Sequence, residues 1–419
     1  MRGGISVKGK KQIITTVLEY ALMLCAVLYS SMWAQFTGAL SNTFSRIFIL
    51  ILGALLCINY QKITARGVYK TAAVVLFLAV FLFFTRYNFI RTLLYLIIPF
   101  ALCFLYLSTK KTGEEKGKFF HYLSDTIVVF SAVSLLLFTF GTLLGLFPET
   151  STVRVWWAEE ERVIPHYLHL LYEAQDIELF GLKFMRNCSI FPEAPAFAAF
   201  IAVSFGAEMF LRKKLSLYRV IILVLATLTS FSAKAVLLVC AALILKLLFW
   251  DKKGAKFVLL KGSAALLSLG FAAFVLVEKA KSHSFFIRLD DFYACLKAFG
   301  TSPIFGAGYY NDSAVITHFE YAYRANDGLS MGLAVLLAQG GLWLFLFYVL
   351  SAAKGVLAAE KSERNCILPF ALIFFGMLFI TNAPFSMLTI FAVSYFASCG
   401  EEGFFERLWE GVKKPFCKA

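Results

Sequence analysis

The sequence predicts an all-α integral membrane protein with about twelve transmembrane helices and two long extracytoplasmic loops that contain short helices. Three observations support this fold class. Hydrophobic residues make up 60% of the 419 residues and aromatic residues 17%, with a mean hydropathy of +0.76, which exceeds the composition of soluble domains. Apolar runs of membrane-spanning length recur along the chain, and lysine and arginine gather in alternate connecting segments.

The predicted spans together form a single polytopic domain over residues 1–419. The first follows Arg2 and Lys8 and lacks a small-residue cleavage site after it, so we expect a retained helix and not a removed signal. The seventh and eighth segments are short for a span. In chain order, the expected spans are residues 13–32, 44–58, 72–84, 89–107, 122–146, 194–211, 220–228, 235–250, 258–277, 329–350, 368–380 and 385–397.

The distribution of lysine and arginine among the connecting segments predicts the orientation of the chain in the membrane. With both termini in the cytoplasm, more than half of the 40 lysines and arginines lie in inner segments, as expected for a multi-pass protein of a cytoplasmic membrane. The net charge of +14 is therefore explained by cationic cytoplasmic segments that orient the chain in the membrane. It gives no reason to expect nucleic acid as a partner. The two long outer loops, residues 147–193 and 278–328, hold most of the remaining polar chemistry, so we expect the function to face outward.

The first outer loop ends in a polar segment that enters an apolar helix. Arg186 and Glu193 lie at this entry, where an ionisable group is either part of a site or satisfied at the membrane interface. Upstream, the pattern of residues 163–180 predicts an interfacial helix. His166, His169 and Glu173 share a face of that helix, which favours a polar surface over a metal site.

The second outer loop carries an expected amphipathic helix over residues 286–300, with Arg288 near its start. Asp290 or Asp291 caps that helix, or the pair holds a divalent ion on a diphosphate, and capping is the simpler interpretation. Gly306 and Gly308 follow, suited to a tight turn or to close approach of a phosphate.

Two further segments bring polar residues to the outer boundary. Arg324, Asn326 and Asp327 lead back into the membrane, and the last two suit a helix N-cap. Lys234 lies between the two short spans, where it either snorkels or joins Arg186, Arg288 and Arg324 in an outward-facing cationic cluster. The loop cysteines Cys188 and Cys295 are placed to form a disulfide, and no cysteine spacing suggests a metal site or another cofactor.

The order of these elements resembles the O-antigen polymerase and ligase superfamily. The shared elements are an Arg-x-x-x-x-Phe-x-Glu-x-Pro-like entry to a span, a Ser-x-Ser-x-basic element, an arginine followed by Pro-Ile-x-Gly-x-Gly, and an asparagine before a helix ending in Gly-Gly. They cover roughly residues 180–345.

The resemblance implies a metal-independent bacterial glycosyltransferase that uses sugars carried on undecaprenyl diphosphate. It implies that Arg186 and Arg288 grip the diphosphate and that Lys234 stands where the family has arginine. It also implies membrane lipid, a flippase and a chain-length regulator as partners. Ligases carry a histidine directly before the asparagine, and Ala325 occupies that place here, which weakens the ligase interpretation.

The residues support the same chemistry. Joining a sugar hydroxyl to C1 of a diphosphate-linked glycan requires a cationic cradle and a proton acceptor. Glu193, His318 and Asp327 are the candidate catalytic bases, and Arg186, Lys234, Arg288, Arg324 and Asn326 the candidate substrate-binding residues. We therefore expect a cell-surface polysaccharide polymerase. A ligase that delivers the glycan to another acceptor and a lipid-linked sugar transporter are the alternatives, although no internal repeat of the kind found in transporters is evident.

Overall fold

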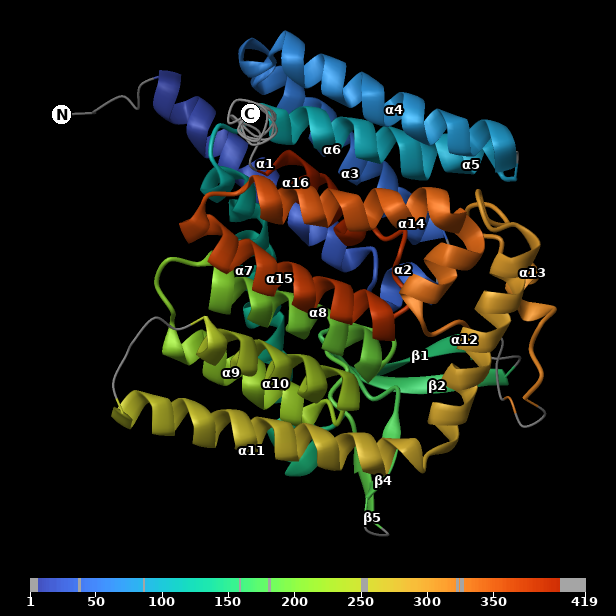
Figure 1. Cartoon of the computed structure of the whole chain (residues 1–419). Helices are drawn as coiled ribbons and strands as arrows, with labels where there is room; N and C mark the ends of the chain where they lie inside the picture. The colour runs from blue at the N-terminus through green and yellow to red at the C-terminus, as the bar shows by residue number, and fades with distance from the viewer. Residues whose placement is uncertain are drawn as a thin grey trace.

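The computed structural model describes residues 7–36, 39–85, 87–157, 160–179, 182–249, 255–321, 324 and 328–399. Figure 1 shows the helices packed side by side, with α4 at one edge of the bundle and α11 at the opposite edge, and with β1, β2 and α12 gathered at one end. The α-helices up to the first outer loop are α1 (Val7–Leu28), α2 (Met32–Phe36), α3 (Ala39–Ile58), α4 (Ala65–Thr85), α5 (Phe89–Thr92), α6 (Ile98–Ser108) and α7 (Gly113–Leu137). Those after it are α8 (Ala194–Gly206), α9 (Leu217–Thr229), α10 (Ala233–Leu248), α11 (Ala255–Ala280), α12 (His283–Thr301), α13 (Ser313–Ile316), α14 (Gly332–Ala358), α15 (Lys361–Ile380) and α16 (Met387–Ser398).

Three helices continue into π-helical turns, which widen the helix by one residue per turn. The segment η2 (Leu93–Ile97) joins α5 to α6, η3 (Phe138–Leu143) extends α7 and η4 (Ala207–Leu211) extends α8. A short 3-10 turn, η1 (Tyr60–Lys62), precedes α4.

Each of the twelve predicted segments falls on a helix. Among the described residues, eight helices are long and apolar enough to cross a membrane, so the protein is a multi-pass membrane protein. Three shorter apolar helical segments are Asn42–Ile58 of α3, Leu217–Thr229 of α9 and Met387–Ser398 of α16, and a total of twelve crossings stays a prediction. The eight are Gly9–Leu28, Ala65–Thr85, Phe89–Ser108, Gly113–Leu143, Ala194–Leu211, Lys261–Ala280, Gly332–Ala358 and Lys361–Ile380.

The prediction of a helix over residues 163–180 is wrong, because the described part of the first outer loop forms strands. Strands β1 (Ser151–Trp157), β2 (Glu160–Tyr167) and β3 (Leu171–Tyr172) form an antiparallel sheet, and β4 (Asp176–Leu179) pairs with β5 (Leu182–Met185). Pro165 lies inside β2, where it would remove a hydrogen bond from a helix. Pairing with β1 buries Val155 and Ile164 against Met32 of α2, a long-range contact that local periodicity does not reveal.

The predicted helix of the second outer loop is confirmed as α12, but the capping role of Asp290 and Asp291 is wrong. Ser282 holds the N-cap position, and both aspartates lie further along the helix, where they accept hydrogen bonds from Arg324 at 3.0 and 2.5 Å. Asp291 is fully buried and also accepts from the backbone N–H of Ser330 at 2.9 Å. The aspartate pair therefore ties α12 to the segment that leads into α14.

Helix α14 is broken at Gly341, and the segment after α12 fills the break. Gly341 has φ 61° and ψ −169°, a region of backbone conformation essentially restricted to glycine. The carbonyls of Ala338 and Gln339, freed by the break, accept from the N–H groups of Ala307 and Gly308 at 2.8 and 2.9 Å. Across the break, the N–H groups of Leu342 and Trp343 donate to the carbonyls of Pro303 and Ile304, both at 2.9 Å.

These four hydrogen bonds, which we call the α14 brace, satisfy backbone groups that could find no water inside a bilayer. They also assign a structural role to the Gly-x-Gly pair, because a Cβ on Gly306 would lie 2.5 Å from backbone atoms of α14. The N–H groups of Gly306 and Gly308 both donate to backbone carbonyls, so neither is free for a phosphate.

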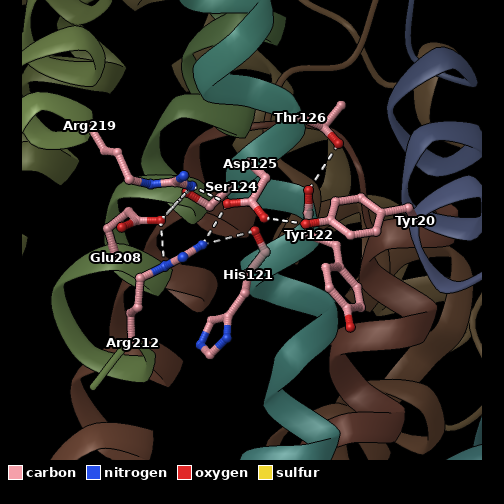
Figure 2. A network of polar contacts seen from close by, with 9 residues as sticks. All are labelled: Tyr20, His121, Tyr122, Ser124, Asp125, Thr126, Glu208, Arg212 and Arg219. Atoms are coloured by element: carbon pink, nitrogen blue, oxygen red, sulfur yellow. Dashed lines mark hydrogen bonds and ion pairs between the residues drawn. The ribbon is translucent and has the colours of Figure 1, made fainter. Parts of the chain in front are cut away.

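A charge network, fully buried at Glu208 and partly exposed at Asp125 and Arg212, joins four helices (Figure 2). Its arginines lie at the turn between η4 and α9, at the other end of α8 from the sheet. Asp125 of α7 accepts from Tyr20 of α1 at 2.6 Å and pairs with Arg212 at 2.7 Å. Glu208 of η4, fully buried, pairs with Arg212 at 3.0 Å and with Arg219 of α9 at 2.9 Å. Two acids and two arginines compensate one another here, which is the arrangement that makes buried charge tolerable.

We expect Gly341→Ala to lower the free energy of unfolding by at least about 2 kcal/mol, because the new methyl group would meet the carbonyl oxygen of Ile304 at 2.3 Å in a backbone region that alanine avoids. Thermal unfolding of the detergent-solubilised protein measures the effect. The matched control is Gly270→Ala in α11, where an added Cβ has no heavy atom within 4 Å and alanine suits the helix better. Equal stability of the two variants would contradict the role assigned to the brace.

Candidate anion-binding site

The candidate site begins at Arg186, which directly follows β5 on the way to α8. Its guanidinium is held by three acceptors: the carbonyls of Ser230 and Phe231, at 3.0 and 3.4 Å, and the side-chain oxygen of Gln175 at 3.2 Å. A guanidinium has five N–H donors, so this side chain is fixed in place while donors remain for a ligand. Arg186 is thus oriented by neutral groups, with no carboxylate forming an ion pair with it among the described residues.

The backbone around Arg186 is fixed by a buried amide. Asn187, with no exposed surface, donates to the hydroxyls of Ser134 and Thr229 at 3.3 and 3.2 Å and accepts from the N–H of Ser189 at 3.0 Å. Ser189 and Phe231 have φ values of +49° and +46°, which are uncommon for residues other than glycine. Strained residues of this kind cluster at functional sites.

Lys234 lies in the first turn of α10, beside the segment that holds Arg186. Its side chain is 7% exposed and forms no hydrogen bond or ion pair with the residues that the structure describes. A lysine near a helix N-terminus opposes the helix dipole, and a buried ammonium without a partner is costly. An anion bound between Lys234 and the N–H groups at the start of α10 would remove both penalties.

Arg288 and Lys279 complete the cationic side of the site. Arg288, half-buried in α12, makes no hydrogen bond or ion pair among the described residues, and it lies within electrostatic range of Lys234, Lys279 and Arg186. Lys279, at the end of α11, donates to the hydroxyl of Ser284. The turn between α11 and α12 therefore brings two cations from adjacent helices to one place.

Glu193 is the carboxylate of the site. It is the N-cap residue of α8, but its side chain makes no capping hydrogen bond, and the neighbouring Ala194 N–H donates instead to Gln175 at 3.2 Å. Glu193 lies within electrostatic range of Arg186, Lys234 and Arg288. The carboxylate is therefore available to accept a proton or a hydrogen bond from a ligand.

The charges of this cluster are unbalanced. Four cations, Arg186, Lys234, Lys279 and Arg288, lie within electrostatic range of one another. They outnumber the two carboxylates in range, Glu193 and Asp291, and Asp291 is already paired with Arg324. Burial lowers the pKa of the Arg186 and Arg288 guanidinium groups, and Glu193 acts in the opposite direction on both. A multivalent anion is the ligand that such a cluster stabilises best.

Two predicted substrate-binding residues lie outside the described part of the chain or away from the cluster. Arg324 is 7% exposed and is occupied by Asp290, Asp291 and the ring of Phe319, 3.4 Å from the guanidinium carbon, so it supports α12 without facing the cluster. Asn326 and the candidate base Asp327 lie outside the described residues.

His318, the third candidate base, follows α13. No hydrogen bond, ion pair or ring contact joins its side chain to the cluster within the described ranges. Of the candidate bases that the structure describes, Glu193 alone lies among the cations.

The other polar residues singled out in the sequence serve the loop structure. The rings of His166 and His169 stack at 3.8 Å, and His169 Nδ1 lies 2.9 Å from the hydroxyl of Tyr172. Burial and the neighbouring His169 hold the pKa of His166 below its ordinary value. Within the described ranges, no group of three or more histidine, cysteine or acidic side chains is arranged to hold a metal ion.

A disulfide between Cys188 and Cys295, which the sequence leaves possible, does not form, because both cysteines are buried and free. Burial raises the pKa of both thiols to about 12. These thiols therefore pack as small apolar groups.

Sequence reasoning missed Gln175 and Lys279. Gln175 orients Arg186 and the first N–H of α8 together, but it was assigned to a helix that does not form. Lys279 lies in the predicted second outer loop, residues 278–328, but it belongs to none of the polar motifs singled out there. The signal that could have found it is its position four residues before His283, where a short turn returns the chain to the same place.

Comparison of the chain with protein-family models, with curated proteins and with solved structures found no match.

We expect Lys234→Met to raise the free energy of unfolding by about 1 kcal/mol or more, because methionine fills a similar volume without burying an unpaired charge. The same change should reduce the stabilisation that inorganic pyrophosphate gives to the solubilised protein in thermal unfolding. A ligand at 100 times its Kd stabilises by about 2.7 kcal/mol.

The control for this experiment is Lys297→Met, which removes an exposed lysine that pairs with Glu320 on the other face of α12. It should leave both stability and the effect of pyrophosphate nearly unchanged. Loss of stability in Lys234→Met with an undiminished pyrophosphate effect would argue that Lys234 is a structural residue.

Proposed function

We propose that the protein is a bacterial polysaccharide polymerase that joins undecaprenyl-diphosphate-linked oligosaccharides at the outer face of the cytoplasmic membrane. The observation that carries the proposal is the cluster of Arg186, Lys234 and Arg288, three buried or half-buried cations that have no carboxylate bound directly to them among the described residues. Their order along the chain matches the arginine and basic elements of the O-antigen polymerase and ligase superfamily, which the sequence resembles.

The chemistry proceeds by direct displacement. The hydroxyl oxygen of the acceptor sugar attacks C1 of the donor sugar and forms the new glycosidic bond, while the bond from C1 to the diphosphate oxygen breaks. The diphosphate leaves with the electron pair and gains negative charge, which the cationic cluster stabilises in the transition state. Glu193 accepts the proton of the attacking hydroxyl.

The polyprenyl tail requires an apolar surface next to the diphosphate site. Helix α11 has no buried residue in its spanning window, and its last turn carries Lys279. A lipid that lies along α11 would therefore bring its diphosphate to the cluster without leaving the membrane.

Two alternatives have specific features in their favour. A ligase would use the same donor site, although Ala325 replaces the histidine that ligases carry before the asparagine. A transporter would use the cations to bind substrate without breaking a bond, and the broken helix α14 is a feature that transporters share. In this protein the α14 brace supplies hydrogen-bond partners to the backbone groups at the break. This favours a structural role for the break over a role in moving a substrate.

The experiment that tests the proposal gives purified protein only a lipid-diphosphate oligosaccharide, with EDTA present and no nucleotide. We expect lengthening of the glycan and release of the lipid diphosphate. Movement of intact substrate across vesicles without lengthening would establish a transporter, and lengthening that requires a second kind of acceptor would establish a ligase.

Arg288 provides the sharpest variant in that assay. Arg288→Ala should lower the rate roughly a hundredfold to a thousandfold, the usual effect of removing one donor aimed at developing charge. Arg288→Lys should recover little of it, because an ammonium cannot replace a planar fork of donors. The control is Lys297→Ala on the other side of α12, which should be nearly silent, and wild-type polymer length in Arg288→Ala at equal protein level would refute the diphosphate assignment.

The proposed orientation has its own test. With the sheet and the anion site outside and both termini in the cytoplasm, a membrane-impermeant maleimide added to cells should label Glu178→Cys and Lys281→Cys. It should not label Glu114→Cys or Glu360→Cys until the membrane is opened. The unsubstituted protein measures labelling of the native cysteines. The reverse pattern would invert the topology and exclude an outer-face enzyme.

A further inference from the structure

Helix α12 carries a carboxylate on the same face as the cation that it contributes to the anion site. Asp291 lies three residues after Arg288, and positions i and i+3 of a helix are neighbours on its surface. The two side chains lie within electrostatic range of each other, and Asp291 has no exposed surface. A direct ion pair between them would occupy the guanidinium that the anion site requires. In the described part of the chain no such pair forms, and the contacts of Asp291 give the reason.

Both oxygens of Asp291 already have partners. The guanidinium of Arg324 donates to Oδ1 at 2.5 Å, and the backbone N–H of Ser330 donates to Oδ2 at 2.9 Å. The hydroxyl of Ser330 also donates to Oδ2. The carboxylate is therefore bound to the segment that leads into α14, and Arg324 is the cation that compensates its charge.

Arg324 is itself held in one orientation. Its second terminal nitrogen donates to Asp290 at 3.0 Å, and the carbonyl of Gly328 accepts from the first at 3.0 Å. The ring of Phe319 lies 3.4 Å from the guanidinium carbon, and only 7% of the side chain is exposed. The planar guanidinium thus bridges two neighbouring carboxylates, which a single ammonium could not do with the same geometry.

We propose that Arg324 is a positioning residue of the anion site, which holds the carboxylate of Asp291 and thereby leaves Arg288 unpaired for the anion. Without Arg324, Oδ1 of Asp291 would carry a buried charge without a partner, which is costly. Arg288 is in electrostatic range and has no partner of its own, so it would take the place of Arg324. The anion would then compete with an internal carboxylate. This role rests on the anion site of the proposed function, but it does not depend on whether the bound anion reacts.

Isothermal titration calorimetry with inorganic pyrophosphate, on the detergent-solubilised full chain, tests the role without turnover. The first variant is Arg324→Met, which keeps an apolar stem beside the ring of Phe319. If Asp291 captures Arg288 in about nine of ten molecules, the apparent affinity for pyrophosphate falls about tenfold, and we expect a loss of at least this size. Adding Asp291→Asn should restore the affinity to within about twofold of the unsubstituted protein, because asparagine has no charge with which to hold Arg288.

The matched control is Arg324→Met with Asp290→Asn. It has the same formal charge as the first double variant, but Asp290 lies two residues after Arg288, where helix side chains do not face each other, so the affinity should stay low. Each double variant removes one of the two acids that Arg324 compensates. Their comparison therefore decides the proposal even where Arg324→Met alone does not fold.

Each other outcome overturns the proposal. Equal rescue by the two acid substitutions would show a general effect of charge, and rescue by neither would show that Arg324 is a structural contact only. Undiminished affinity in Arg324→Met, or no binding of pyrophosphate to the unsubstituted protein, would also exclude the role. A protein that shows the expected pattern but does not lengthen the glycan would keep this role for Arg324 and lose the assignment as a polymerase.

Discussion

Charge buried away from water must be compensated, and this requirement separates the two ends of the bundle. At the end opposite the sheet, nearly every buried ionisable group has a partner. The acids of the network in Figure 2 pair with two arginines, Glu19 pairs with Lys110 at 2.5 Å, and Lys116 and Lys354 donate to the last carbonyls of α16. At the sheet end, Lys234 and Arg288 have no such partner in the described chain. The same physical rule therefore distinguishes an end whose charges are paired from an end that carries the candidate binding site.

The scaffold that supports the site is made of neutral hydrogen bonds. Gln175 and the carbonyls of Ser230 and Phe231 hold Arg186, and Asn187 fixes the backbone beside it. A carboxylate in their place would neutralise the guanidinium before a ligand arrived. Orientation by neutral acceptors keeps the full charge available, which is the property that an anion site requires.

The sequence was sufficient to predict the helices, including α12 in the second outer loop, and insufficient to predict the strands of the first outer loop. Runs such as residues 72–84 are apolar throughout, so lipid and length alone determine their structure. The prediction for residues 163–180 failed because Ile164 takes its conformation from Val153, a partner in another strand, and because the leucine spacing imitates a helix. Arg186, Glu193, Lys234 and Arg288 were found because charge at a membrane boundary is conspicuous. Gln175 could not be found, since a neutral amide becomes informative only when its acceptor oxygen is seen between Arg186 and Ala194.

The brace across α14 has a consequence for how the helix is stabilised within the membrane. Gly341 lies about 13 Å along the helix from Gly332, so the break falls well inside the apolar layer. During synthesis, residues 303–308 leave the ribosome before α14 does, and they supply the only described hydrogen bonds to the groups freed at the break. Residues 303–308 and α14 therefore form one hydrogen-bonded unit, in which the helix depends on the preceding loop for the backbone partners at its break.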